Sequence, residues 1–239
     1  MFLKLYEIKI TLLLKRNVNL IDVQEFLSSN INKSMLEDSF LKKQHSEKGF
    51  KPYSLGSLYP FDLENKMYHK NQMYVLTMRS IDKQFLQSLS SVLKSSKKLD
   101  FNVIAIEFLT RDYGFVESAF TLTPAIISIK DEEKNYIRYW TKEEGSLDFV
   151  KKRIKDNLEK KYEQFFNEKI VAPDDFILMI SIQNRKAIVS NYKGTKLWTN
   201  KFKIMFAPDE VSQKLASLAF GVGILEKNSL GLGFLTKGR

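Results

Sequence analysis

Two histidines are the residues best suited to proton transfer near neutral pH, because the chain contains no cysteine. Each of them, His45 and His69, has an ordinary pKa of about 6.5 and can give or take a proton. His45 lies in a lysine-rich polar segment, which favours an exposed side chain. The simpler interpretation is a surface histidine at a helix end, where the helix dipole favours its charged form. Two histidines without cysteine do not predict a metal site, so no metal or other cofactor is expected.

Lys51 follows His45 by six residues, at the expected start of a strand. A lysine beside a scissile phosphate can stabilise the extra negative charge of a pentacoordinate transition state. An ordinary lysine at a strand edge is the alternative interpretation.

A glycine-rich stretch near the end of the sequence could bind phosphate. It contains two Gly-x-Gly pairs, Gly221/Gly223 and Gly231/Gly233. Each glycine permits positive φ and close backbone approach, so the loop could present bare amides and a lysine to a phosphate chain. The polar linker between the pairs supplies Lys227, Asn228 and Ser229 as further candidate contacts.

Two known phosphate loops do not fit this stretch. A Walker A loop needs Gly-x4-Gly-Lys-Ser/Thr, which does not occur, and the dinucleotide fingerprint needs a strand before it and a helix after it. Here a helical pattern precedes the glycines and a short apolar strand follows them. A glycine helix cap followed by a turn into an edge strand is the structural alternative.

Two segments together resemble one family. Residues 219–234 resemble the glycine-rich signature of the repeat-associated RNA-binding (RAMP) proteins of CRISPR systems. Residues 45–54 resemble the catalytic stretch of the CRISPR-associated endoribonuclease of Cas family six, which cuts repeat RNA into guides. The resemblance implies that His45 is the catalytic acid/base and Lys51 the transition-state stabiliser. It also implies a metal-independent reaction in which the ribose 2′-hydroxyl attacks the adjacent phosphate, leaving a 2′,3′-cyclic phosphate and a 5′-hydroxyl.

One position departs from that family. Several members carry a tyrosine on the first helix as a second proton-transfer group, whereas this chain has Asn30, Ile31 and Asn32 there. Tyr53, two residues after Lys51, and His69 in the following turn are the two candidate substitutes. The residues do not decide between them.

The positive charge of the chain favours a polyanionic partner. The formal net charge is +10 and the isoelectric point is about 9.4. Residues 151–161 alone carry a net charge of +4, on the face of an expected helix opposite its apolar stripe. A solvated helix face is one interpretation, and a surface for the phosphates of duplex RNA is the other. The candidate contacts in this segment are Lys151, Lys152, Arg153 and Lys155.

The order of expected elements predicts an α+β fold. Residues 1–112 predict a β-α-β-β-α-β unit and residues 113–239 a second one, which is a tandem ferredoxin-like fold. In the first unit we expect one helix from Asp22, with a capping box to Glu25, and His45 just beyond that helix. The strands expected in the second unit cover residues 119–130, 176–182, 186–190, 196–206 and 230–236, and the helices cover residues 146–168 and 208–220.

The sequence therefore predicts an endoribonuclease acting on CRISPR repeat RNA. Other Cas proteins of an interference complex and a second copy of the chain are open as partners. Residues 2–14 are interrupted by charges and do not predict a signal peptide or membrane span, so a soluble cytoplasmic protein is expected. One alternative is a non-catalytic RNA-binding scaffold of the same superfamily. The other is a protein-interaction module whose charge serves only solubility.

Overall fold

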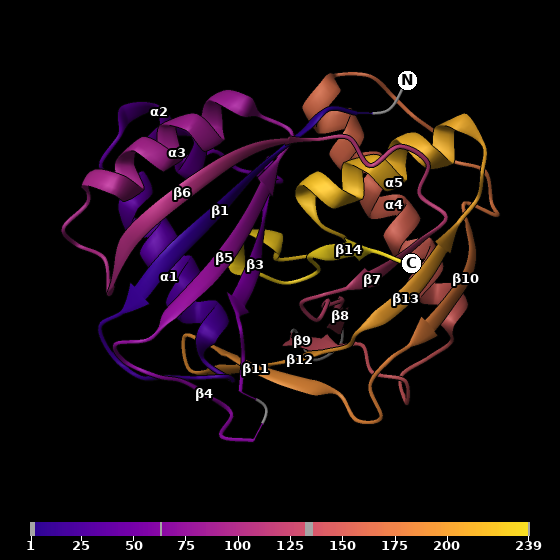
Figure 1. Cartoon of the computed structure of the whole chain (residues 1–239). Helices are drawn as coiled ribbons and strands as arrows, with labels where there is room; N and C mark the ends of the chain where they lie inside the picture. The colour runs from indigo at the N-terminus through magenta and orange to yellow at the C-terminus, as the bar shows by residue number, and fades with distance from the viewer. Residues whose placement is uncertain (1–2, 63, 132–135, 239) are drawn as a thin grey trace.

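Two four-stranded antiparallel sheets lie side by side in the computed structural model, which describes residues 3–62, 64–131 and 136–238 (Figure 1). The first sheet has the order β3-β5-β1-β6 and one face covered by helices. Its strands are β1 (Leu5–Leu14), β3 (Tyr53–Tyr59), β5 (Met73–Ser80) and β6 (Phe101–Arg111). The helices beside it are α1 (Val23–Met35), α2 (Ser39–Ser46) and α3 (Lys83–Ser95), and a short pair is formed by β2 (Val18–Asn19) and β4 (Met67–Tyr68).

The second sheet has the order β10-β13-β7-β14. Its strands are β7 (Ser118–Thr121), β10 (Ile177–Ile182), β13 (Phe202–Phe206) and β14 (Leu235–Lys237), with helices α4 (Leu147–Phe166) and α5 (Glu210–Val222) packed beside them. Two separate hairpins pair β8 (Ser128–Asp131) with β9 (Tyr136–Tyr139) and β11 (Ile188–Tyr192) with β12 (Thr195–Thr199). A single 3₁₀ turn, η1 (Asn228–Leu230), lies between α5 and β14.

Both sheets have the same topology. In each, the first strand lies between the third and the fourth, and the second strand is at the edge. This is the strand order that two split β-α-β units produce, so the predicted tandem ferredoxin-like fold is confirmed. The division into residues 1–112 and 113–239 stays a prediction, although the link between β6 and β7 falls there.

Alternation along β1 explains how its sequence specifies a half-covered strand. Ile8, Ile10, Leu12 and Leu14 are fully buried under the helices, while Lys9 and Thr11 between them are partly exposed. Successive side chains of a strand point to opposite faces, so over residues 8–14 this pattern buries one face only.

Helix α5 packs against both sheets. It contacts β1, β3 and β5 of the first sheet and β13 and β14 of the second. A Cβ atom placed on Gly221 would meet the side chains of Leu5 and Ile81, so glycine allows the close approach of this helix to the first sheet.

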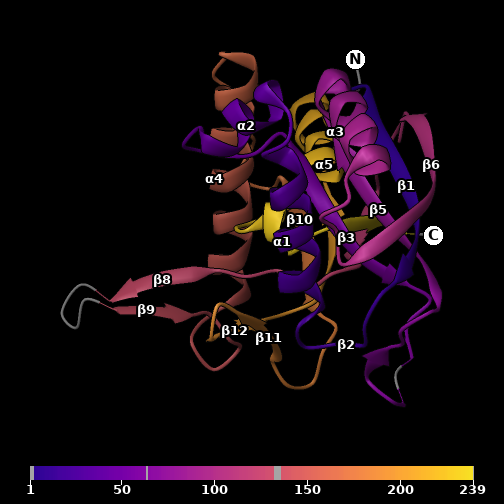
Figure 2. The same ribbon diagram turned by 90° about the vertical axis from the view of Figure 1, so that its left-hand side faces the viewer.

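The expected strand over residues 119–130 is wrong. The structure breaks it into β7, which joins the second sheet, and β8, which forms the projecting hairpin with β9 (Figure 2). Pro124 lies between them, and proline cannot donate to a strand ladder.

The expected strand over residues 196–206 is also two strands. Asn200 separates β12 from β13 and forms an isolated bridge with Ala125. Residues 186–190, expected in the main sheet, instead contribute to the β11–β12 hairpin.

The expected first helix is two helices, because the chain turns at residues 36–38 and Asp38 caps a new one. His45 therefore lies in the last turn of α2 and not beyond a helix. The expected capping box is absent, since Asp22 makes no side-chain cap. Its carboxylate accepts from Asn191, and that of Glu25 accepts from the Lys193 amide, so both acids hold the β11–β12 hairpin against α1.

Candidate functional site

The two segments that the sequence singled out lie against one another. Ser54 Oγ, in β3, donates a hydrogen bond to the Gly221 carbonyl oxygen at 3.0 Å. One residue earlier, the Tyr53 hydroxyl lies beside the side chain of Ser229 in η1 and donates to Met35 Sδ at 3.9 Å. The segment with His45 and Lys51 and the glycine-rich loop, 167 positions apart at this contact, thus form one region.

His45 is half-buried near the end of α2. Burial first, and the neighbouring charge of Lys51 second, lower the pKa of His45 below its ordinary value of 6.5. The imidazole is therefore mainly neutral at pH 7 and can accept a proton.

Lys51 closes the end of α2. Its Nζ donates to the carbonyl oxygens of Gln44 at 2.8 Å, His45 at 3.0 Å and Glu47 at 2.6 Å. These are carbonyls that a helix end leaves without partners. Lys51 thus fixes the turn that carries His45 and places a positive charge beside it.

The two candidate substitutes for the missing helix tyrosine lie elsewhere. Tyr53 is 1% exposed and stacks on Phe85 with ring centroids 4.8 Å apart. Burial raises the pKa of its phenol far above the ordinary value, and its contact with Ser229 lowers it only in part. His69 follows β4, at the opposite end of the first sheet from α2 (Figure 1). The structure brings neither to the surface beside His45.

A cleft of about 510 Å³ opens next to Lys51. It lies between the end of α2, the start of α3 and the end of α4, and Phe50, Lys51 and Phe166 are among its lining residues. Gln164 of α4 holds the Phe50 backbone through a reciprocal pair of hydrogen bonds, both 2.8 Å. Helix α4 therefore forms one wall of the region around Lys51.

The glycine-rich loop is folded on itself and does not present a row of bare amides. The amides of Gly223, Gly231 and Gly233 donate to the carbonyls of Ala219, Asn228 and Pro124 respectively. Gly223 and Gly233 have φ angles of 75° and 71°. A Cβ atom on either one would lie within 3 Å of the Asn228 side-chain amide, so these two glycines make room for Asn228.

The polar centre of the loop faces two ways. Asn228 is buried, Ser229 is partly buried beside Tyr53, and Lys227 is exposed. Lys227 has a left-handed backbone with φ of 58°. Of these three polar residues, Lys227 is the one whose side chain is exposed to solvent.

Comparison with known proteins identifies the family of the chain. Residues 113–236 match the family model described as CRISPR associated protein Cas6, C-terminal. That match spans more than half of the chain. The chain belongs to the Cas6 family.

Relatives of the family match nearly the whole length of the chain. A curated protein of Methanocaldococcus jannaschii, named CRISPR-associated endoribonuclease Cas6 2, is 26% identical over 93% of this chain and 98% of that protein. Two solved structures have the same fold. One is described as a RAMP protein binding different RNA substrates, with a TM-score of 0.75 and 16% identity over 98% of this chain and 100% of that one. The other is a Cas6-related protein from Pyrococcus furiosus, with a TM-score of 0.73 and 17% identity over 97% of each chain.

The basic residues of α4 are mostly engaged with this Cas6-family fold itself. Lys155 pairs with Asp174 at 2.9 Å, Arg153 pairs with Glu226 at 2.6 Å, and Lys151 donates to the Leu178 carbonyl at 3.3 Å. Lys152 is exposed. The four candidates therefore do not form one continuous surface of free cations.

Sequence reasoning missed Lys161, which it counted with the charged face of α4. Lys161 is 1% exposed and donates to the glycine-rich loop. A signal was present, because Ile154, Leu158 and Lys161 follow the apolar spacing of the helix. A lysine on that stripe is the pattern that could have identified it.

Two further properties concern the described part of the chain only. None of its helices is both long and apolar enough to cross a membrane. Within the same residues, no group of three histidine, aspartate or glutamate side chains is arranged to hold a metal ion.

Proposed function

We propose that the protein is a metal-independent endoribonuclease that cuts CRISPR repeat RNA into guide RNAs. Membership of the Cas6 family supports this, as does the name of the Methanocaldococcus relative, an endoribonuclease. The net charge of +10 suits an RNA partner. The observation that carries the proposal is the contact of the His45–Lys51 segment with the glycine-rich loop, through Ser54 and Gly221.

The reaction needs no water and no metal ion. The 2′-oxygen of the ribose forms a bond to the adjacent phosphorus while the bond from phosphorus to the 5′-oxygen breaks. The proton leaves the 2′-hydroxyl and another arrives on the 5′-oxygen, giving a 2′,3′-cyclic phosphate and a 5′-hydroxyl. Positioned proton transfer of this kind contributes about 10² to 10⁴ in rate.

His45 is the proton-transfer group in this proposal. Its lowered pKa gives a mainly neutral imidazole at pH 7, which suits removal of the 2′-hydroxyl proton. Lys51 contributes positive charge beside the scissile phosphate and also holds the turn that carries His45. Tyr53 supports the site from inside, through its contact with Ser229.

The RNA would lie along the glycine-rich loop, and the exposed cations Lys227 and Lys152 would bind its phosphates. Lys151, Arg153 and Lys155 remain in their ion pairs and hydrogen bonds, and they contribute to the positive electrostatic potential of α4 that would attract RNA. Gly221, Gly223, Gly231 and Gly233 shape the loop, and Asn228 and Ser229 anchor it. Other Cas proteins and a second copy of the chain are proposed as further partners, in the cytoplasm.

A non-catalytic RNA-binding scaffold is the second candidate. The engaged state of Lys51, whose three hydrogens all reach carbonyl oxygens, favours it. The burial of Tyr53 also favours it, because neither Tyr53 nor His69 then serves as a second proton-transfer group beside His45.

Single-turnover cleavage of repeat RNA from the same genome, in EDTA, tests the proposal against this alternative. The wild-type protein should cut at one position. His45→Ala should bind with unchanged affinity and fail to cut, and RNA with a 2′-deoxyribose at the cut position should bind and survive. Tight binding by the wild-type protein without a cut would establish the scaffold instead.

A further inference from the structure

A buried lysine holds the glycine-rich loop in shape. Lys161 projects from α4 and its Nζ donates to the Gly223 carbonyl at 2.8 Å, the Leu225 carbonyl at 3.0 Å and Asn228 Oδ1 at 2.7 Å. An ammonium has three hydrogens, so these three acceptors use its whole capacity.

Asn228 completes the clamp from the other side. Its Nδ2 donates to the carbonyls of Ile224 at 2.7 Å and Leu232 at 2.8 Å. The one side chain of Asn228 therefore ties both arms of the loop together and accepts from Lys161 with its oxygen. Gly223 and Gly233 lie next to this side chain. A Cβ atom at either position would overlap the Asn228 amide, so glycine is required there.

Lys161 also touches the other segment of the site. Its Nζ lies 5.6 Å from the centre of the Phe50 ring, next to Lys51 in sequence. One turn along the same helix, Gln164 holds the Phe50 backbone. Lys161 thus stands between the His45–Lys51 segment and the glycine-rich loop.

The environment of Lys161 costs free energy that a neutral residue would avoid. Burial lowers its pKa to about 7, and Glu226 opposes this only in part. The Glu226 carboxylate itself pairs with Arg153 at 2.6 Å. A buried cation without a carboxylate partner destabilises the native state unless hydrogen bonds compensate for its lost hydration.

We propose that Lys161 is a positioning residue that fixes the glycine-rich loop in the form that binds RNA, acting through Asn228 and two backbone carbonyl oxygens. The inference rests on the proposed function, since it concerns the same RNA site. At 1% exposure Lys161 cannot itself contact a phosphate. The loop geometry and the exposure of Lys227 depend on it.

Lys161→Met beside Lys160→Met is the test, because the same substitution is made at adjacent positions and Lys160 is exposed. Equilibrium binding of repeat RNA and the single-turnover rate at saturating protein are measured for both, well below the melting temperature. Lys161→Met should weaken RNA binding about tenfold, because it removes a set of buried charged hydrogen bonds. Lys160→Met should weaken RNA binding less than about twofold. The rate at saturation should change less than the affinity does.

The salt dependence of binding separates positioning from direct contact. Lys161→Met should keep the wild-type slope, whereas loss of one phosphate contact would reduce the slope by about 0.7 for single-stranded RNA. Equal losses in both variants, or an unchanged affinity in Lys161→Met, would overturn the inference. If Lys161→Met does not fold, Asn228→Ala decides by the same measurements. If the wild-type protein neither binds nor cuts repeat RNA, the proposed function fails first.

Discussion

Ser54 Oγ donates a hydrogen bond to the carbonyl oxygen of Gly221, at 3.0 Å, in the interior of the protein. Ser54 stands three residues after Lys51, and Gly221 lies in the last turn of α5. The contact supplies a hydrogen-bond donor to one of the carbonyls that a helix end leaves without a partner. It makes the loop that follows α5 a direct neighbour of the strand that follows Lys51, so the proposed catalytic segment and the proposed RNA-binding loop lie side by side.

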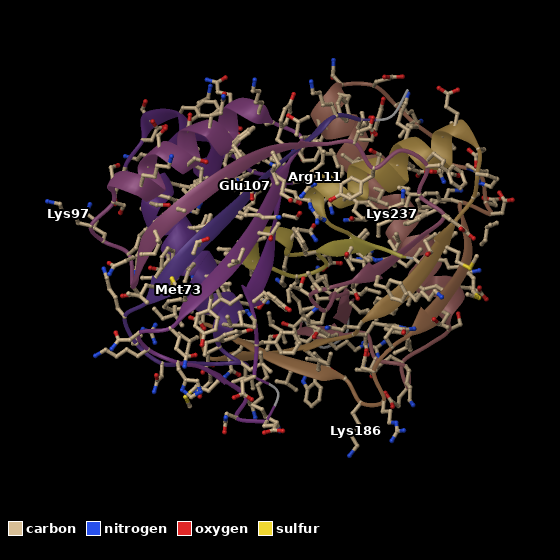
Figure 3. All side chains as sticks on the ribbon, viewed as in Figure 1. Met73, Lys97, Glu107, Arg111, Lys186 and Lys237 are labelled. Atoms are coloured by element: carbon tan, nitrogen blue, oxygen red, sulfur yellow. The ribbon has the colours of Figure 1, made fainter. Side chains whose placement is uncertain are left out.

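A second buried contact joins the two sheets. Glu7 accepts from Arg79 at 2.7 Å and from Arg111 at 2.7 Å, and Arg79 also donates to the Leu235 carbonyl at 2.7 Å. Arg79 lies over the Phe234 ring with its guanidinium 4.3 Å from the ring centre. Figure 3 shows Arg111 at the boundary between the two halves of the molecule. The ion pair therefore ties the first sheet to the strand that follows the glycine-rich loop.

Glu7→Gln should lower the free energy of unfolding by about 3 kcal/mol, because it leaves a buried guanidinium without its carboxylate. Glu107→Gln is the matched control on the neighbouring strand. Its partner Lys9 is 3.9 Å away and its side chain is 59% exposed, so it should cost about 0 to 1 kcal/mol. Urea denaturation of both variants measures the difference, and equal costs would contradict the account.

The same pair predicts how stability depends on acid. Burial raises the pKa of Glu7, but the hydrogen bonds from Arg79 and Arg111 outweigh burial and hold the pKa below 4.5. A lowered carboxyl pKa stabilises the native state above the unfolded value, and that contribution is lost as the pH falls through the native value. The wild-type advantage over Glu7→Gln should therefore be full above about pH 4.5 and shrink below it. A pH-independent difference would show that the pair does not set this pKa.

The pH profile of cleavage should report His45. Its inflection is expected below pH 6.5, and Lys51→Met should move it upward, because removing a nearby positive charge makes protonation easier. Lys48→Met, at an exposed position three residues earlier, should leave the inflection in place. The measurement is the single-turnover rate against pH in all three proteins. An inflection that Lys51→Met does not move would remove Lys51 from the electrostatics of the site.

Lys227→Met should weaken RNA binding and reduce its log-log salt slope by about 0.7, as expected when one phosphate contact of single-stranded RNA is lost. Lys97→Met is the control, since Lys97 is an exposed lysine at the outer edge of the first half of the molecule (Figure 3). It should leave both quantities unchanged. An equal change in the two variants would mean that the RNA senses only total charge.

Much of the fold could be predicted because its elements have strong periodicity. The alternation of β1 and the repeated order of strands and helices specify the two ferredoxin-like units. The wrong strand and helix boundaries each arise at a single polar residue or proline. Pro124 and Asn200 each interrupt an apolar run by ending or redirecting a strand, and Asp38 starts a new helix where the apolar pattern continues.

The site was predicted in its segments and missed in its internal contacts. His45, Lys51 and the glycines stand out by residue type and spacing. Lys161 did not, because it was grouped with the other charged residues of α4 and its partners lie more than sixty positions away. The glycines were assigned to phosphate binding, whereas Gly223 and Gly233 make room for Asn228. Contacts of this kind depend on tertiary packing, which local sequence patterns do not encode.

The chemical identity of the cut ends tests the central claim most directly. Repeat RNA cut by the wild-type protein in EDTA should give an upstream fragment ending in a 2′,3′-cyclic phosphate and a downstream fragment beginning with a 5′-hydroxyl, as mass spectrometry would resolve. Those ends arise only when the 2′-hydroxyl is the nucleophile, as His45 is proposed to assist. Fragments with a 3′-hydroxyl and a 5′-phosphate, formed only after a divalent metal ion is restored, would contradict the account.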